Sequence, residues 1–439
     1  MNAFGACRQR GLSLIELLVA MVLGLLVSTG AVSIFIQMSA HNRVQRQLAR
    51  LQEEGRFAIG RLNQDIALAN GQYCNNTGGS AKQQANGIYL DALRSPQVYA
   101  TGLADAMESS DLTTRMGSAP YPPAPGTPYP LPSFLAMRGY DCGMSMCTPV
   151  DPNAAGASAI PQMGTTIDSR VRGADVLTMR YIDASSGWAI GSGTSIHIDP
   201  AFPGELKNIT LSPGDNEPPR SDFSPTHLAM LADCAGAQIF SVNVSGNTLT
   251  PDGYNLAAPT AYEQAVAARL FDFNRDYRTV TYYLAVVSNG NDGHTGALIR
   301  QTNGNDGNKG GTREELVRGV ERLDFRYAVE DADGNVSYLT AAEVDAGVSC
   351  PPAPPNAPNA LEVGCMWRAV KGVHASMLLS GHLALHTLKD DELSYLYEPD
   401  SNDSAPPSAH PIKPSDQGFE TKLIRREFNT LVSVRNFNP

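Results

Sequence analysis

Residues 11–40 read GLSLIELLVAMVLGLLVSTGAVSIFIQMSA. From Leu17 to Ala40 this stretch contains no charged residue. At about 1.5 Å of rise per residue, some twenty apolar residues in a helix cross the roughly 30 Å hydrocarbon core of a membrane. Within that core a single segment satisfies its backbone hydrogen bonds only as a helix. The stretch therefore predicts a membrane-spanning helix near the N-terminus.

Charged residues lie in front of this helix and inside it. Arg8 and Arg10 precede it with no acid beside them, which predicts that the extreme N-terminus stays in the cytoplasm and that the rest is exported. Glu16 lies within the apolar helix, where a charge costs about 2.5–3.5 kcal/mol in lipid. A secretory signal peptide has a shorter apolar core with a cleavage site after it, and a plain signal anchor gives no reason for Glu16. A carboxylate in this position needs a partner.

Beyond Ala40 the helical pattern continues without a proline. Apolar or small residues recur at intervals of three and four, which is typical of one helix face packed on a core. These residues are Val44, Leu48, Leu51, Gly55, Ile59, Leu62 and Ile66. Asn70–Gly71 predicts the end of the helix. We expect one long helix with an apolar first half and an amphipathic second half.

From residue 72 onward the pattern changes to short segments with an alternation of period two. The clearest segments are 176–182, 279–287, 323–329, 373–379 and 428–434. Strands and helices do not alternate regularly, so an antiparallel sheet is expected. Three stretches rich in Pro, Gly, Asn or Ser are predicted to be loops, namely 118–133, 289–312 and 399–414. The predicted fold class is α+β, with the long helix packed on an antiparallel sheet domain.

The segment Gly11-Leu12-Ser13-Leu14-Ile15-Glu16 resembles the processing signal of type IV pilins and of type II secretion pseudopilins. The resemblance implies cleavage after Gly11 by prepilin peptidase and N-methylation of Leu12, a position where the family usually has Phe or Met. It places Glu16 at the fifth mature position, where the carboxylate neutralises the amine of a neighbouring subunit and sets the axial register of a filament. It divides the chain into a leader at 1–11, a membrane-spanning or filament-core half-helix at 12–40, an exported half-helix at 41–71 and an exported β-rich domain at 72–439.

Later segments resemble the minor pilin family PilW and its J-type pseudopilin relatives. Residues 316–327 (LVRGVERLDFRY), 367–379 and 425–436 are similar to strands of that family in the same order, and residues 231–240 are more loosely similar. The resemblance implies a lollipop-shaped minor pilin that takes part in type IV pilus assembly within a priming or tip complex.

The same resemblance implies partners and a location. The implied partners are prepilin peptidase, other minor pilins, a pilus-tip adhesin and the major pilin. The implied location is the inner membrane with the domain in the periplasm, and later the pilus at the cell surface. Two alternatives stay open: a J-type pseudopilin of type II secretion, and a membrane-anchored periplasmic enzyme or binding domain.

Seven cysteines are present, and Cys7 falls in the leader. The six others form an even set in an exported domain, which favours disulfides. Fifteen connectivities are possible for six cysteines. Short loop closure favours Cys142–Cys147 and Cys350–Cys365, which leaves Cys74–Cys234. Zinc is the weaker alternative, because the chain has no C-x-x-C pair.

The remaining features predict no other chemistry. A net charge of -11 argues against nucleic-acid binding, and a hydrophobic content of 42% excludes wholesale disorder. No P-loop, Rossmann fingerprint or G-x-S-x-G motif occurs, so we expect no catalytic residue, no cofactor and no enzyme activity. His382 and His386 lack the Glu of a zinc-protease motif, so no metal is expected there. Asp333–Gly334 is predicted to be a hairpin turn, while a weak calcium site in the Asn- and Asp-rich loops stays open.

Overall fold

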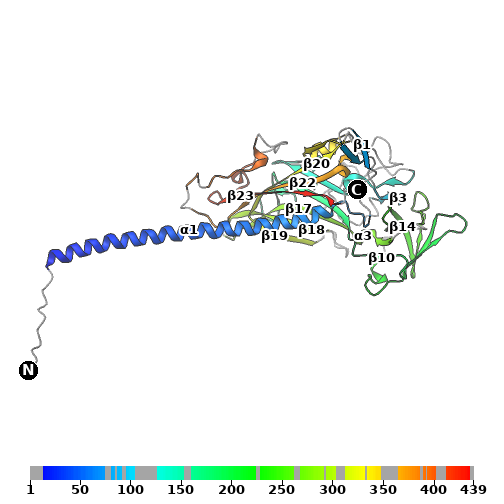
Figure 1. Ribbon diagram of the computed structural model, residues 1–439, viewed down its shortest axis with the longest axis horizontal. Helices are drawn as coiled ribbons and strands as arrows, with labels where there is room; N and C mark the ends of the chain where they lie inside the picture. The colour runs from blue at the N-terminus through cyan, green and yellow to red at the C-terminus, as the bar shows by residue number, and fades with distance from the viewer. Residues whose placement is uncertain are drawn as a thin grey trace, which may run out of the picture.

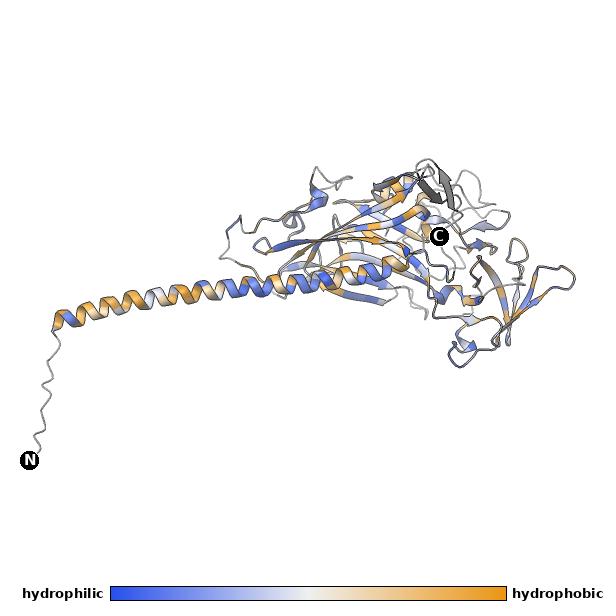
Figure 2. Ribbon diagram, in the orientation of Figure 1, coloured by the Kyte–Doolittle hydropathy of each residue, from blue (hydrophilic) through white to orange (hydrophobic). Residues whose placement is uncertain are grey.

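The long helix and the body behind it account for most of the molecule (Figure 1). The computed structural model describes residues 13–74, 81–84, 87–90, 95–103, 126–152, 160–223, 228–261, 267–290, 293–302, 312–331, 334–347, 364–385, 389–391, 393–401 and 412–435. Helix α1 (Leu14–Leu68) projects from a β-rich body, and only its second half lies against that body. Figure 2 shows the same division as a change from apolar to polar along the helix.

Helix α1 ends where the sequence predicts. Ser13 is its N-cap residue, and Ala69 follows its last residue. Asn70 has a positive φ of 63°, a conformation that Asn tolerates better than most residues. The predicted core stripe is confirmed, because Leu51, Leu62 and Ile66 are fully buried.

An eight-stranded sheet carries the second half of α1. Its strands run in the order β19-β18-β17-β9-β5-β6, with β8 beside β17 and β7 beside β8. The pairings are antiparallel except for the short parallel pair β7–β8. The strands are β5 (Met137–Cys142), β6 (Cys147–Thr148), β7 (Met163–Gly164), β8 (Arg170–Val171), β9 (Val176–Ile182), β17 (Tyr277–Ser288), β18 (His294–Thr302) and β19 (Thr312–Arg318).

A four-stranded antiparallel sheet packs beside the first. Its order is β21-β20-β22-β23, and the strands are β20 (Val320–Glu330), β21 (Val336–Leu339), β22 (Val370–Ser380) and β23 (Arg425–Ser433). Gly319 leads the chain from β19 into β20 with a φ of 90°, which favours glycine. Helix α4 (Ala341–Ala346) follows β21. Buried side chains from α1 and both sheets form one core, which includes Leu62, Leu284, Phe325 and Met377.

A third sheet, here called the inserted sheet, is formed mostly by the chain that connects two neighbouring strands of the first sheet. β9 and β17 are paired, with Ile182 opposite Tyr277, and the chain between them forms most of the inserted sheet. The sheet has the order β10-β16-β13-β14-β15-β12-β11, with β3 and β4 at one side. Its strands are β3 (Gln97–Val98), β4 (Tyr129–Pro130), β10 (Trp188–Ala189), β11 (Ser195–Ile198), β12 (Leu206–Thr210), β13 (Leu228–Ala232), β14 (Ala237–Ser245), β15 (Thr248–Pro251) and β16 (Arg269–Asp272).

The inserted sheet buries side chains on both of its faces. One face has a core of its own, with Trp188, Phe240 and Leu270. The other face adds Met230, Phe271 and further residues to the main core. The short helix α3 (Phe273–Asp276) returns the chain to β17. A separate hairpin is formed by β1 (Ala81–Gln84) and β2 (Gly87–Leu90), and short 3-10 turns are η2 (Ser133–Leu135), η3 (Arg220–Asp222), η4 (Cys365–Ala369), η5 (Glu398–Asp400) and η6 (Pro414–Gln417).

The predicted α+β class and antiparallel pairing are confirmed, with two short parallel exceptions, β3–β14 and β7–β8. One loop prediction is wrong: residues 289–312 contain β18, which pairs with β17 along its whole length. Glycine and polar residues mask its alternation, and long-range pairing stabilises it. Residues 118–125 and 402–411 of the other predicted loops lie outside the described residues. β20 and β21 form the predicted hairpin, although Asp333 itself is also outside them.

Candidate functional site

The first half of α1 is a bare apolar rod. Its large side chains from Leu14 to Met38 are all exposed, and Phe35, for example, is 74% exposed. Within the described chain, α1 is the one helix that is long and apolar enough to cross a membrane. A monomer in water does not leave such a surface uncovered, so lipid or other protein helices must surround it.

Glu16 lies in the first turn of this rod. The Ser13 backbone N–H donates to Glu16 Oε2 over 2.9 Å, and the Glu16 N–H donates to Ser13 Oγ over 3.2 Å. This capping box satisfies two N–H groups at the helix start, where the dipole also favours a negative charge. The predicted processing residues Gly11 and Leu12 lie outside the described residues.

The second half of α1 packs closely on β23. A Cβ atom at Gly55 would lie 2.5 Å from the ring of Phe428, so glycine allows the helix to approach this strand. Two turns further on, Thr430 donates to Asn63 Oδ1 over 3.4 Å. Gly55 and Phe428 therefore mark a close approach between α1 and the four-stranded sheet.

A buried ion pair connects the same helix to β17 and β18. Arg300 Nε lies 2.6 Å from Asp65 Oδ2, and the Tyr282 hydroxyl donates to the same oxygen over 2.6 Å. The Asp65 side chain is only 3% exposed. Burial and the adjacent Asp65 charge raise the pKa of Tyr282, so it remains a neutral donor. Although burial alone would lower it, the hydrogen bond and charge of Asp65 raise the pKa of Arg300.

A third contact fixes α1 nearer the bare rod. His382 Nε2 lies 2.9 Å from Glu54 Oε2, and Gln47 Nε2 donates to the Leu383 carbonyl over 3.0 Å. Burial disfavours the charge on Glu54, but hydrogen bonds from His382 and Arg50 lower its pKa. His386 lies outside the described residues. Among the described residues, no group of three His, Cys, Asp or Glu side chains is placed to hold a metal.

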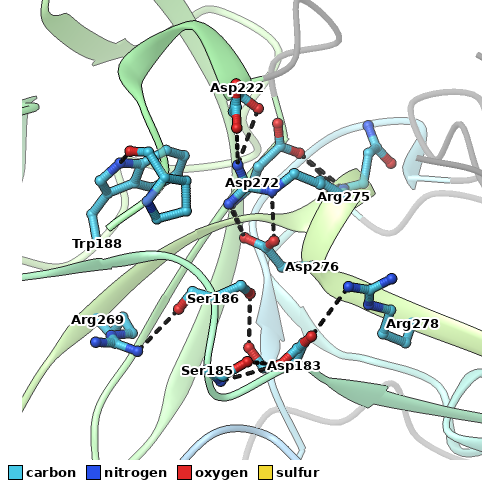
Figure 3. Close-up of polar contacts among 12 residues, drawn as sticks. Asp183, Ser185, Ser186, Trp188, Asp222, Arg269, Asp272, Arg275, Asp276 and Arg278 are labelled. Atoms are coloured by element: carbon cyan, nitrogen blue, oxygen red, sulfur yellow. Dashed lines mark hydrogen bonds and ion pairs between the residues drawn. The ribbon is translucent and has the colours of Figure 1, made fainter. Parts of the chain in front are cut away.

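A polar network ties the inserted sheet to the main sheet where the chain leaves β9 and returns to β17 (Figure 3). Asp183 accepts from Ser185 and forms an ion pair with Arg278 at 3.1 Å. Although burial opposes it, these hydrogen bonds and the Arg278 charge lower the pKa of Asp183. Asp272 caps α3, and Arg275 lies over the Trp188 ring at 4.8 Å. The junction is therefore held by many directed contacts.

Disulfides link further parts of the β-rich body. The structure joins Cys142 to Cys147 across the β5–β6 turn and Cys74 to Cys234 over 160 residues of sequence. The second bond fastens the chain just after α1 to the turn between β13 and β14, which belongs to the inserted sheet. Cys365 is also disulfide-bonded, and its expected partner Cys350 lies outside the described residues.

Sequence reasoning did not find Asp65 or the inserted sheet. Asp65 did leave a signal, because it lies three residues after Leu62 and next to Ile66 on the buried stripe, where an acid needs a partner. The inserted sheet gave a weaker signal in the sequence, because its strands have the same alternation as those of the main sheet. Only the pairing of the strands distinguishes the two sheets.

Comparison with known families agrees with this geometry at both ends of the chain. Residues 7–32 match the prokaryotic N-terminal methylation motif. Residues 281–436 match the family described as type IV pilus-assembly protein W (PilW). The second match begins within β17 and runs past the end of β23, so it leaves out the inserted sheet. No curated protein and no solved structure matches the chain.

A prepilin-type N-terminus, a bare apolar helix and an antiparallel sheet body define the class of pilin-like proteins. Within that class the chain carries a PilW domain, and this domain together with the methylation motif supports a minor pilin of type IV pilus assembly. This role implies contact with other pilus components. The helix and the methylation motif fit an anchor in the membrane with an exported domain.

Proposed function

We propose that the chain is made as a precursor with a leader at 1–11, which prepilin peptidase cleaves after Gly11, and that Leu12 becomes the methylated first residue. The observation that carries this proposal is the methylation motif over residues 7–32 in front of a bare apolar helix. Residues 12–40 first span the inner membrane and then enter the filament core. Residues 41–71 seat the exported domain, 72–439, on that helix.

The mature protein then joins other minor pilins in a complex that primes assembly and remains at the pilus tip, next to the major pilin and a tip adhesin. The PilW domain supports membership of such a complex. Glu16 sets register, because its carboxylate neutralises the new amine of a neighbouring subunit and so lowers the cost of both charges in an apolar filament core. The exported domain is in the periplasm before assembly and at the cell surface afterwards.

Mass spectrometry of the mature protein tests the processing step. We expect the first residue to be N-methyl-Leu12 in cells with an active peptidase, and an uncleaved chain that begins at Met1 in cells without one. An intact Met1 in both kinds of cell contradicts the proposal.

Substitution of Glu16 tests the register step. Glu16→Ala should leave membrane insertion intact, since it removes a costly charge, but should lower the amount of this protein in sheared pili severalfold. Ser13→Ala is the matched control, because it removes the Ser13 Oγ acceptor of the capping box and keeps the carboxylate with its bond from the Ser13 backbone N–H. If Ser13→Ala impairs incorporation as much as Glu16→Ala, the start of the helix and not the Glu16 charge controls incorporation, contrary to the proposal.

A further inference from the structure

Three arginines form a one-sided basic surface on α1 just beyond its apolar half. Arg43, Arg46 and Arg50 are exposed and follow one another at intervals of three and four, so they share one face of the helix. Leu48 and Leu51 on another face pack on the core of the body, while Arg46 and Arg50 line an open hollow beside Leu316–Arg318 of β19. Figure 2 shows the corresponding change to polar residues directly after the apolar rod.

Negative charge is found only at the C-terminal end of the arginine face, where Glu53 and Glu54 lie beside Arg50. Between Glu16 and Glu53 the chain has no acidic residue. In the part of the chain that the structure describes, Arg43 and Arg46 have no carboxylate within ion-pair distance, and only Arg50 is paired, with Glu54 at 2.8 Å. The protein as a whole carries a net charge of -11, so this concentration of positive charge is a local feature.

The position of these arginines along the helix matches the headgroup layer of a membrane. Arg43 and Arg46 lie about 4.5 and 9 Å beyond Ala40 along the helix axis. The polar layer on each side of a bilayer is roughly 5–8 Å thick. When residues 17–40 span the membrane, Arg43 therefore lies within the headgroup layer, and Arg46 reaches its outer edge because its side chain points back toward the N-terminus of the helix.

The positions of the arginines are the reverse of the usual distribution of charge around a membrane helix. Positive residues favour the cytoplasmic side, and here several lie on the exported side within a few turns of the span. Processing after Gly11 would remove Arg8 and Arg10 from the other side.

We propose that Arg43 and Arg46, with Arg50 beside them, bind anionic lipid headgroups on the exported face of the membrane. Guanidinium groups bind phosphate oxygens in pairs and keep their charge at any physiological pH. The contact would hold the unassembled subunit at a defined depth and would be given up when the helix enters a filament. The inference rests on the anchoring step of the proposed function, and not on incorporation into a pilus.

The test uses the full-length protein in nanodiscs of equal parts phosphatidylcholine and phosphatidylglycerol. Native mass spectrometry then measures the ratio of the two lipids that remain bound to the protein. We expect the wild type to retain phosphatidylglycerol in excess, and the excess to fall roughly fivefold for each arginine in the variant Arg43→Gln/Arg46→Gln. Arg43→Lys/Arg46→Lys, which keeps the charge, should retain most of the excess, and high salt should remove it.

Arg56→Gln is the matched control. Arg56 is exposed and also has no carboxylate within ion-pair distance in the described part of the chain, but it lies about 24 Å beyond Ala40. Its loss should leave the lipid ratio unchanged. Retention of the two lipids in equal amounts by the wild type overturns the inference, as does an equal effect of Arg56→Gln. So does an unchanged ratio in Arg43→Gln/Arg46→Gln, which would point to an acidic protein surface as the partner. If the wild type does not enter the nanodisc, both the anchoring step and this inference are wrong.

Discussion

Asp65 shows how one residue connects the helix to the body. It lies on the buried face of α1, where a carboxylate is unfavourable unless charges and donors surround it. Arg300 and Tyr282 supply them from two neighbouring strands, with N···O and O···O distances of 2.6 Å. The arrangement favours the orientation of α1 in which Asp65 faces these two strands, because a rotation of the helix would separate the carboxylate from both donors.

Removal of the Asp65 carboxylate should therefore be costly. We expect Asp65→Ala to lower the free energy of unfolding by about 3 kcal/mol, because the largely buried Arg300 keeps only the more distant Glu314, at 3.9 Å, and the Tyr282 hydroxyl loses its acceptor at 2.6 Å. Urea unfolding followed by the fluorescence of Trp188 and Trp367, both fully buried, measures this. Lys422→Gln is the control: it breaks a surface pair with Asp390 and should change stability by less than about 1 kcal/mol. Equal effects of the two variants would contradict a stabilising role for Asp65.

A second buried acid predicts a dependence on pH. Asp175 accepts from the backbone N–H groups of Cys142 and Phe325 over 2.9 Å each, and so links the two main sheets. Burial, together with the charges of Asp324 and Asp141, raises the pKa of Asp175 well above its usual range. The folded chain therefore keeps a proton that the unfolded chain has lost, and its stability falls as pH rises from about 4 toward the raised pKa.

This dependence should be smaller in Asp175→Asn. The difference in unfolding free energy between wild type and variant should shrink as pH rises, by about 1.4 kcal/mol for each unit by which the pKa is raised. Urea unfolding at a series of pH values measures it. A difference that grows with pH would show that the carboxylate is ionised at low pH in the folded protein, contrary to this prediction.

At the scale of elements, α1 combines two surfaces made for different neighbours. Its first half presents apolar side chains in all directions, while its second half buries one stripe and exposes polar residues elsewhere. Because the two halves form one continuous helix, the packing of the second half on the body also fixes the direction of the first half (Figure 1). The closeness of α1 to β23 depends on the absence of a side chain at Gly55.

Two glycines on α1 should therefore respond in opposite ways to alanine. Gly55→Ala places a methyl group against the Phe428 ring and should destabilise the protein by about 1–3 kcal/mol through overpacking. At Gly60 nothing lies within 4 Å of the added atom, and the exposed Gly60→Ala should stabilise by up to about 1 kcal/mol. Urea unfolding measures both. A gain at Gly55 similar to that at Gly60 would mean that the helix is not closely packed there.

At the scale of the whole molecule, an inserted sheet extends a minor pilin body. The insertion leaves and returns at paired residues of β9 and β17, so the main sheet is continuous without it. It nevertheless packs on the main core, and the Cys74–Cys234 bond and the junction of Figure 3 hold it in place. The inserted sheet, which the PilW match leaves out, is thus packed into the body.

The two described disulfides should differ in their contribution to stability. The loop closed by Cys74–Cys234 is far longer than that closed by Cys142–Cys147. Loop entropy predicts a loss of about 5 kcal/mol for Cys74→Ser/Cys234→Ser and of about 2 kcal/mol for Cys142→Ser/Cys147→Ser. Trp188 reports on the core of the inserted sheet and Trp367 on the main core, so fluorescence also shows where unfolding begins. An equal loss in the two variants would contradict the long-loop effect.

The sequence by itself determined the helix, its division into an apolar and an amphipathic half, the processing motif and the main strands. These features follow from the spacing of apolar residues and from short motifs, which are local along the chain. Only the tertiary structure decided that β18 is a strand, that Asp65 finds Arg300, and that the chain between β9 and β17 forms a sheet of its own. Each of these depends on groups brought together from distant positions, and pairing over such distances is set by the competition of whole strands and faces for the same core.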